Sequence, residues 1–523
     1  MNRNLLIVVL TIFLFSSACR SINSTNQSEN TQPTNDESFS VPDSDINLAK
    51  PLEFSKNPVD VALCEKLNQI IETSDLANAR WGVMAVSLKD GRIVCGRDER
   101  KLFNPASIQK TLTAIVALDR FGADFRWKTS VYAAKEIEDG AIDGDLTLYG
   151  RGAPDFDSAA LENLAAQLQA KGLKRVTGNI VGDESYFTGD NLGDGWTWND
   201  VQWYYGAEAS ALSFDGNEID VYMQDGKPVA SNDYLSIESD LQPKQTGKTE
   251  AYGIKRGLAD NRIYIWGNGE KASGRMSVAN PAGWTAKLFK DALQKKGIAV
   301  EGDVKSANWQ SKNKLNVEQS VELASIESKT LAEIVRRMNK NSVNIYAELI
   351  LRTLGKNFGD TANAETKQLQ EVRGDDSAGT SVIKKFLREN RVLTDDIQIH
   401  DGSGLSRLDF VTPEAFARAL IYAAQSKFSD VFINSLPVAA TDGTLGGRLG
   451  KVKGKIYAKT GSISSVNSLA GYALTAENEV LAFTIISNNV AKKTDSAHVI
   501  DVIAANLVEP SAGESKNEKE KQK

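Results

Sequence analysis

The chain has 523 residues, of which 41% are hydrophobic and 25% are charged, a balance typical of a globular protein with two or three domains. Its net charge of -7 at pH 7 provides no basic field for a phosphate backbone, so we expect no nucleic-acid partner. Small or zwitterionic substrates are compatible with this charge.

Residues 1–18 are expected to form a secretory signal peptide. Arg3 precedes an apolar run from Leu5 to Phe15, which is too short to span a membrane, and small residues follow it. Cys19 comes next and resembles the lipid-attachment cysteine of bacterial lipoproteins, although Ser16 stands where that pattern prefers Leu. The favoured prediction is an exported protein of the periplasm or cell envelope, anchored to a membrane through Cys19. Simple cleavage without lipidation is the alternative.

Two polar segments flank the remaining chain. Residues 19–50 are rich in Ser, Asn, Thr and acidic residues and predict a flexible tether, while residues 509–523 predict a disordered tail. Cys64 and Cys95 form an even pair in an oxidising compartment, which predicts a disulfide between two N-terminal elements. Two buried thiols are the alternative. No histidine lies near either cysteine in the sequence, so we expect no metal site there.

The periodicity of the chain predicts a mixed α/β (α+β) class. Alternating apolar residues over 81–97 and 468–489 predict two antiparallel hairpins at opposite ends of the chain, with turns at 89–92 and 475–478. Helical periodicity appears in five further stretches: 111–121, 158–172, 283–297, 330–355 and 381–390.

The stretch FNPASIQKTLTA contains a serine and a lysine at the start of an expected helix. Pro105 predicts the first helical turn, and residues three apart share one helix face, so Ser107 and Lys110 would project side by side. In a cleft such a pair can act as nucleophile and base, whereas facing water it is an ordinary first turn. The pattern is weak by itself, because it recurs at Ser311–Lys314 and Ser381–Lys384.

The two histidines offer little to a Ser-His-Asp mechanism. His400 precedes DGSGLS, which lacks the spacing of a nucleophile elbow, and His498 lies in the apparent last helix. A lysine must then be the base, and Lys110 can serve if burial or a neighbouring cation lowers its pKa toward neutrality. The helix N-terminus would stabilise the Ser107 oxygen as it becomes anionic.

Two later motifs complete a recognisable series. Lys459, Thr460 and Gly461 form the only Lys-Thr-Gly of the chain. The pattern Ser-x-Asn is weak by itself, since Ser-Val-Asn occurs both at Ser342–Asn344 and at Ser465–Asn467. The order Ser-x-x-Lys, Ser-x-Asn, Lys-Thr-Gly is that of the penicillin-recognising serine enzymes. Together with LTLYGRGAPDF, GWTWNDVQWYYGAEASALSFDGN, HDGSGLSR and TDGTLGGRL, these motifs make the chain resemble the class C low-molecular-mass penicillin-binding proteins, which are D-alanyl-D-alanine carboxypeptidases and endopeptidases.

The resemblance covers nearly the whole chain and implies a fold. It implies a penicillin-recognising serine transpeptidase or β-lactamase-like domain, with an antiparallel sheet flanked by helices and two nested inserted domains. The 235 positions from Ser107 to Ser342 exceed what neighbouring active-site elements need, which agrees with an insertion. The expected parts are a catalytic domain at 51–128 and 327–508, domain II at 129–203 and 286–326, and domain III at 204–285.

The resemblance also implies roles for the matching residues. In the family, Ser342 relays a proton to the leaving amine and Asn344 holds the amide carbonyl of the substrate. Lys459 and Thr460 bind the terminal carboxylate or its surroundings. Each residue type suits its role, since hydroxyls carry protons, amides fix peptide groups, and a cation with a hydroxyl captures a carboxylate.

Further matches concern the oxyanion and the substrate side chain. Gly461 would permit close approach of substrate to an edge strand, and the backbone amides of Ser107 and Ser462 would form the oxyanion hole. Asp200, in WTWND, matches the family residue that meets the side chain of diaminopimelate, where a carboxylate favours an ammonium group. A polar loop residue beside surface tryptophans is the alternative for Asp200. The stretch 401–407 predicts a polar loop near the site, and no residue of it is assigned a role.

These residues predict an exported serine-type D-alanyl-D-alanine carboxypeptidase or DD-endopeptidase, a cell-wall hydrolase. Ser107 would attack the bond between two D-alanines, or a D,D cross-link, in peptidoglycan stem peptides, and water would release the acyl-enzyme. No metal or organic cofactor is expected, and β-lactams should acylate Ser107. The alternatives are a β-lactamase, which the long insertion and WTWND argue against, and a non-catalytic peptidoglycan-binding protein, which has no need of the Ser-Lys pair.

Overall fold

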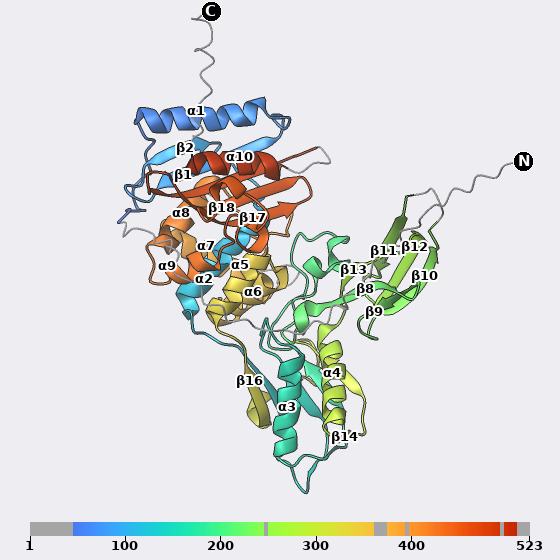
Figure 1. Ribbon diagram of the computed structural model, residues 1–523. Helices are drawn as coiled ribbons and strands as arrows, with labels where there is room; N and C mark the ends of the chain where they lie inside the picture. Colours follow the sequence, from blue (N-terminus) through green and yellow to red (C-terminus); the bar gives the residue numbers. More distant parts are fainter. Residues whose placement is uncertain (1–44, 245–248, 360–373, 393–396, 492–495, 510–523) are drawn as a thin grey trace, which may run out of the picture. The chain divides into compact units, whose positions relative to one another are not determined.

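The computed structural model describes most of the chain (Figure 1). The described residues are 45–244, 249–359, 374–392, 397–491 and 496–509. The expected signal peptide, Cys19, most of the expected tether and nearly all of the expected tail lie outside them. Within the described ranges, no helix combines the length and the apolar character needed to cross a membrane.

The two predicted hairpins are confirmed, and they join in one antiparallel sheet. Its strand order is β17 (Ile456–Ile463), β18 (Val466–Leu474), β19 (Val480–Asn488), β1 (Arg80–Ser87) and β2 (Ile93–Arg97). β1 pairs with β19 along its whole length, so the two ends of the described chain meet in the middle of the sheet. Every residue of β19 is buried, as expected for a strand covered on both faces.

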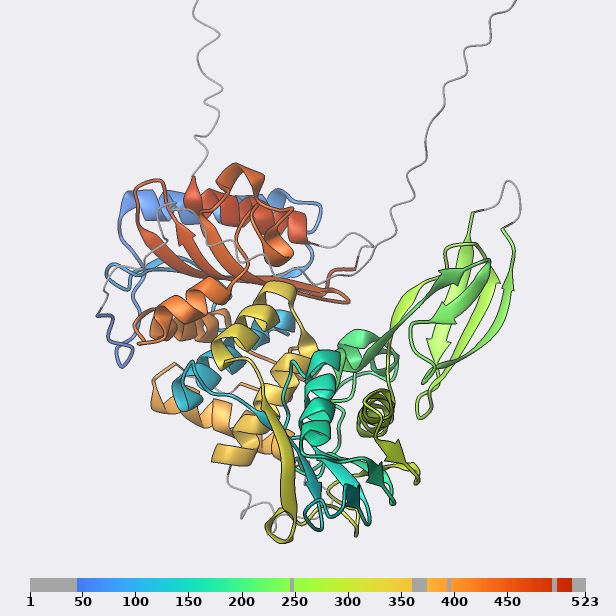
Figure 2. The ribbon, with the colours of Figure 1, turned by 60° about the horizontal axis from the view of Figure 1, so that its bottom comes forward.

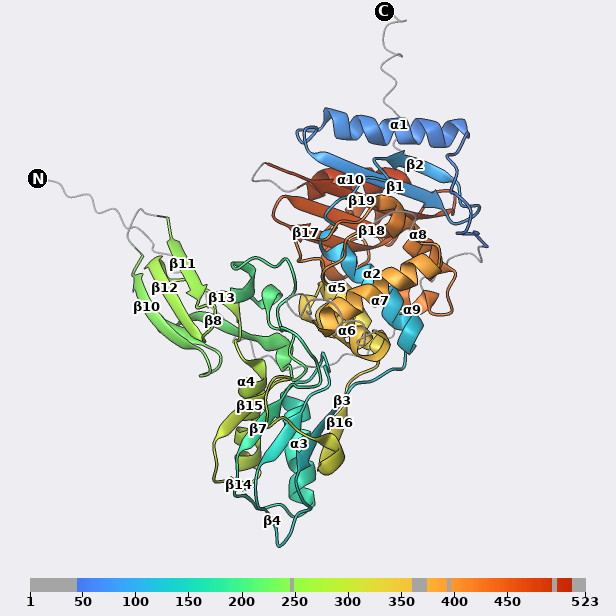
Figure 3. The same cartoon turned by 180° about the vertical axis from the view of Figure 1, so that it is seen from behind.

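Helices cover both faces of this sheet (Figures 1 and 3). α1 (Pro58–Thr73) packs on β2, and α10 (Ala497–Val508) packs on β18 and on α1. α8 (Pro413–Ala424) packs on β1 and β19 from the other side. The core between the sheet and the first pair of helices is apolar, and its members include Trp81, Leu469, Ile485 and Ile503.

Helices surround α2 (Gln109–Phe121). Helix α2 contacts α5 (Leu331–Asn341), α6 (Asn344–Phe358), α7 (Asp375–Glu389) and α9 (Ser429–Ser435). The first ten residues of α2, Gln109 to Leu118, are all buried, as expected of a helix enclosed on all sides. The helical periodicity predicted over 330–355 is confirmed, but it belongs to two helices, because Ser342 adopts a left-handed conformation (φ 57°, ψ 43°) that ends α5 before α6 begins.

The segment between α2 and α5 forms further sheets. The larger one has the order β15 (Val304–Ala307), β7 (Ile180–Asp183), β5 (Leu146–Tyr149), β3 (Lys128–Ala133) and β16 (Val321–Glu327). α3 (Ser158–Ala170), the teal helix of Figure 2, packs on β16, and α4 (Pro281–Lys295) packs on β7 and β15. Lys128 pairs with Glu327 across β3 and β16, so the chain leaves and returns at one place.

Smaller sheets complete the inserted segment. A three-stranded sheet joins β4 (Ala141–Ile142), β6 (Arg175–Val176) and β14 (Ala299–Val300). Two more lie in residues 218–277, one of β8 (Glu218–Gln224), β9 (Lys227–Ala230) and β13 (Gly274–Ser277), the other of β10 (Ser236–Gln242), β11 (Ala251–Arg256) and β12 (Arg262–Asn268). Both of the latter lie between β7 and α4 in the sequence, and thus within the larger insertion.

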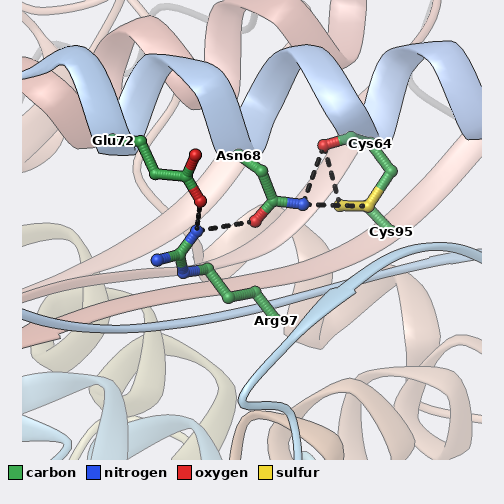
Figure 4. Close-up of a disulfide and its surroundings, with 5 residues drawn as sticks. All are labelled: Cys64, Asn68, Glu72, Cys95 and Arg97. Atoms are coloured by element: carbon green, nitrogen blue, oxygen red, sulfur yellow. Dashed lines mark hydrogen bonds and ion pairs between the residues drawn. A yellow bond between two sulfur atoms is a disulfide. The ribbon is translucent and has the colours of Figure 1, made fainter.

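A disulfide joins α1 to the edge strand β2 (Figure 4). The Cys64 and Cys95 sulfurs are 2.13 Å apart, and the Cα atoms are 4.8 Å apart. Next to it, Asn68 donates to the Cys64 carbonyl at 3.0 Å, and Arg97 donates to Asn68 at 2.9 Å and to Glu72 at 3.2 Å. The helix is therefore held to the sheet by a covalent bond and by a polar chain along the same side.

Candidate active site

Ser107 lies in a single 3-10 turn, Ala106–Ile108, that leads into α2. Asn104 accepts the Ala106 N–H at 3.1 Å. Asn488, at the end of β19, accepts the Asn104 N–H at 2.8 Å and donates to its carbonyl at 3.0 Å. Ala106 has a positive φ of 49°, a strained conformation for a residue with a side chain. The sheet thus fixes the backbone just before the serine.

Lys110 is fully buried and touches three oxygens. Its Nζ lies 2.8 Å from Ser107 Oγ, 2.7 Å from Asn344 Oδ1 and 2.8 Å from the Ser403 carbonyl oxygen. Burial lowers the pKa of Lys110 to about 7. A neutral amine has two N–H donors and one lone pair, so donation to Asn344 and Ser403 leaves the lone pair for the Ser107 hydroxyl proton.

Ser342 forms a second serine–lysine contact. Ser342 lies in the break between α5 and α6 and is half-buried, and its Oγ accepts from Lys459 Nζ at 2.9 Å. Lys459 lies on β17, is fully buried and also donates to the Thr460 carbonyl at 2.6 Å. Burial first, and then the charge of Lys110, lower the pKa of Lys459 well below its usual range. The Thr460 hydroxyl is 2.6 Å from that of Thr444.

β17 lies against the turn that carries Ser107. A Cβ on Gly461 would be 2.9 Å from the Ser107 backbone nitrogen and 2.2 Å from Ser468 Oγ, so only glycine permits this approach. Ser462, the next residue of β17, is exposed and accepts from Asn467 at 3.1 Å. Strand and turn therefore bring the Lys-Thr-Gly and Ser-x-x-Lys motifs into contact.

Some of these residues line one cavity of about 570 Å³, whereas Lys110, Lys459, Thr460 and Gly461 lie outside its lining. Its lining includes Ser107, Ser342, Asn344 and Ser462, together with Asp200 from the inserted segment. Asp200 is only 7% exposed, and its Oδ2 accepts from the Thr197 N–H and hydroxyl, at 3.0 and 2.6 Å. The carboxylate therefore lies in the lining of the cavity, with one oxygen used by its own turn.

The structure adds contacts that the motifs do not name. Asn344 Nδ2 donates to the Tyr205 carbonyl at 2.8 Å, which orients its amide and leaves one N–H for a substrate carbonyl. Arg407 lines the cavity and donates to the Ser464 carbonyl at 3.0 Å. Every residue type has a backbone carbonyl, so the sequence could not show that the Tyr205 carbonyl accepts from Asn344. The Gly-rich stretch 401–407, by contrast, predicted the loop that supplies the Ser403 carbonyl.

The histidines lie elsewhere. His400 Nδ1 is 2.8 Å from Asp194, and His498 is 3.5 Å from Asp75. Neither histidine lines the cavity. Among the residues that the structure describes, no three His, Cys, Asp or Glu side chains are grouped so as to hold a metal ion.

Known proteins resemble this chain over most of its length. The model of the D-Ala-D-Ala carboxypeptidase 3 (S13) family matches residues 63–507. The D-alanyl-D-alanine carboxypeptidase of Actinomadura sp. (strain R39) is 30% identical over 476 residues, which cover 86% of this chain and 84% of that protein. The D-alanyl-D-alanine carboxypeptidase DacB of Haemophilus influenzae is 27% identical over 440 residues, or 80% of this chain and 88% of that protein.

A solved structure shows the same fold. The crystal structure of penicillin binding protein 4 from Haemophilus influenzae matches with a TM-score of 0.72 and 24% identity, covering 85% of this chain and 98% of that one. The likeness confirms the predicted penicillin-recognising fold.

Proposed function

This chain belongs to the D-Ala-D-Ala carboxypeptidase 3 (S13) family, and on that premise we propose that Ser107 is the nucleophile of a serine-type D-Ala-D-Ala carboxypeptidase. The observation that carries the proposal is the 2.8 Å contact of Ser107 with a fully buried Lys110 whose other two contacts are acceptors. The substrate is a peptidoglycan stem peptide that ends in D-alanyl-D-alanine. β-Lactams are substrate mimics that acylate the same oxygen.

The reaction then follows from the contacts. Lys110 takes the hydroxyl proton of Ser107 while Oγ attacks the carbonyl carbon of the penultimate D-alanine. When the peptide bond breaks, Ser342 passes a proton to the leaving nitrogen and regains one from Lys459, its hydrogen-bond partner at 2.9 Å. Water then attacks the resulting ester and gives its proton through Ser342 to Lys459, while Lys110 returns its proton to Ser107 Oγ as the acyl group leaves.

Charge stabilisation is assigned to β17 and the turn. We propose that the backbone N–H groups of Ser107 and Ser462 form the oxyanion hole, where each donor contributes about 3 kcal/mol in the transition state. Lys459 and the Thr460 hydroxyl take the terminal carboxylate of the substrate. The negative charge of the substrate carboxylate raises the pKa of Lys459. We therefore expect Lys459 to take up a proton when the substrate binds.

Asp200 is proposed to select the side chain of the stem peptide. Its carboxylate lies in the lining of the same cavity as Ser107 and would attract the ammonium group of a diamino acid. The involvement of one of its oxygens in a local turn supports a fixed position for the other.

We propose the following domains. The pairing of Lys128 with Glu327 supports a catalytic domain of 51–128 and 327–508, interrupted by domain II. Because α4 begins at Pro281 and packs on β7 and β15, we place the end of the nested domain III at 280, a few residues before the expected 285.

The protein is proposed to work in the cell envelope. The disulfide between Cys64 and Cys95 supports an oxidising compartment. A lipid on Cys19 would hold the enzyme at a membrane. Incorporation of labelled palmitate into the wild type and not into Cys19→Ala would support the anchor, and equal labelling would contradict it.

The test of the function is the release of D-alanine from a stem pentapeptide by the purified protein. We expect release by the wild type and none by Ser107→Ala. Release of a free stem peptide from a D,D-cross-linked dimer would add the endopeptidase activity. Wild type that cleaves neither substrate would contradict the proposal.

A further inference from the structure

Behind Lys110 lies a group of buried carboxylates to which the proposed reaction gives no role. Glu348 lies on α6, one turn after Asn344, and Asp401 and Asp409 lie in the loop before α8. All three side chains have no exposed surface. Burying charged groups is costly unless they are paired or used, so their presence behind the base calls for a reason.

Glu348 binds the loop where it meets Lys110. Its Oε1 accepts the N–H of Gly402 at 3.1 Å and that of Ser403 at 2.9 Å. Its Oε2 is 3.4 Å from Arg352, one turn further along α6. The peptide groups that Glu348 holds directly precede the Ser403 carbonyl that accepts from Lys110 at 2.8 Å. A shift of this carboxylate would therefore move an acceptor of the base.

Asp401 holds the same loop from within. Its two oxygens accept from the N–H groups of Gly404 and Ser406, at 2.6 and 2.7 Å, and from Trp196 Nε1 at 2.9 Å. The Ser403 hydroxyl also donates to it, at 3.2 Å. These four donors satisfy both oxygens of the buried Asp401 side chain. The loop is thus folded around Asp401.

Gly404 brings the loop against the turn of Ser107. Its φ is 79°, and a Cβ there would lie 1.9 Å from the Ala106 carbonyl oxygen. The loop therefore contacts the nucleophile turn on one side and the base on the other. Its position affects both members of the Ser107–Lys110 pair.

The carboxylates near Lys110 counteract the effect of burial on its pKa. Burial lowers the pKa of Lys110, while Asp401 and then Glu348 raise it; Lys459, across on β17, has a pKa lowered well below its usual range. Burial and then the charge of Asp401 raise the pKa of Glu348, and the same two causes raise that of Asp409 well above its usual range. Asp401 is therefore the carboxylate whose charge acts most strongly on Lys110 and on the other two carboxylates.

We propose that Glu348 and Asp401 are positioning residues of the nucleophile–base pair: they hold the Ser403 carbonyl on Lys110 and supply negative charge that offsets the burial of Lys110. This inference rests on the proposed function of Ser107 and Lys110. A base is most effective when its pKa is close to the working pH. Without the carboxylates, Lys110 would stay unprotonated to lower pH and be a weaker base.

The test uses Glu348→Gln, which keeps an acceptor oxygen for Gly402 and Ser403 and removes the charge. The second-order rate constant for acylation by penicillin is measured from about pH 5 to pH 9. We expect the acid limb of the profile to move to lower pH by roughly half to one unit, with a severalfold lower plateau. The matched control is Glu414→Gln, which removes another buried glutamate paired with an arginine one turn on, Arg418 at 2.8 Å.

Each outcome decides the inference. An unshifted acid limb in Glu348→Gln, or an equal shift in Glu414→Gln, would overturn it. Glu348→Asp keeps the charge and shortens the reach, so a lower plateau with an unshifted limb is expected, and a wild-type plateau would overturn the positioning role even if Glu348→Gln failed to fold. A wild type that penicillin does not acylate at any pH would contradict the proposed function itself.

Discussion

Two serine–lysine pairs of nearly equal distance and different surroundings reach the cavity through their serines. Lys110 is 2.8 Å from Ser107 and Lys459 is 2.9 Å from Ser342, and both lysines are fully buried. Burial lowers the pKa of both lysines; Asp401 and Glu348 partly counteract this effect at Lys110, whereas the charge of Lys110 lowers the pKa of Lys459 further. A short contact between serine and lysine therefore does not define a role. The charged groups near each lysine distinguish the two pairs.

The largest expected effect comes from the first pair. Lys110→Ala removes the base, and we expect acylation by penicillin to slow by at least about a thousandfold. Stopped-flow or gel-based acylation rates measure this. A loss of less than about tenfold would show that another group takes the Ser107 proton, and would remove the distinction between the pairs.

The second pair should respond in a substrate-dependent way. Lys459→Ala is expected to slow cleavage of a peptide with a free terminal carboxylate by roughly a hundredfold, because a buried cation partner is lost. A substrate with an amidated C-terminus should lose less. Hydrolysis rates of the two peptides with wild type and variant give the comparison, and equal losses would contradict a carboxylate role for Lys459.

The pH profile of the wild type tests the state of the base. With a pKa of about 7, Lys110 is protonated and inactive below that pH and neutral above it. Acylation should therefore fall about tenfold for each pH unit below neutrality and level off above it. A flat profile from about pH 5 to pH 8 would mean that Lys110 does not titrate as the base.

The smallest effect is expected at Asp200, outside both pairs. Asp200→Asn should reduce cleavage of a stem peptide with a diamino acid by up to about tenfold, through the loss of one charge contact. Acylation by a penicillin without an ammonium group should not change. Equal reduction for both ligands would support the alternative, in which Asp200 only stabilises its turn.

The sequence predicted the parts of the site that reside in side chains at fixed spacing. The contact of Ser107 with Lys110 follows from their spacing of three residues, although Ser107 lies in the 3-10 turn that leads into α2, and the hairpins follow from alternation. The break at Ser342 could not be predicted, because a left-handed serine has none of the signal that a glycine gives. Glu348, four residues after Asn344, lies on the same helix face, but its burial against a loop more than fifty residues away depends on tertiary structure.

The most direct test is mass spectrometry of the purified protein after incubation with a fluorescent penicillin, with Ser107→Ala in parallel. We expect a stable adduct on the peptide that contains Ser107 and no adduct in the variant. No adduct with rapid consumption of the drug would indicate a β-lactamase. No adduct and no consumption would contradict catalysis by Ser107 and leave a peptidoglycan-binding protein.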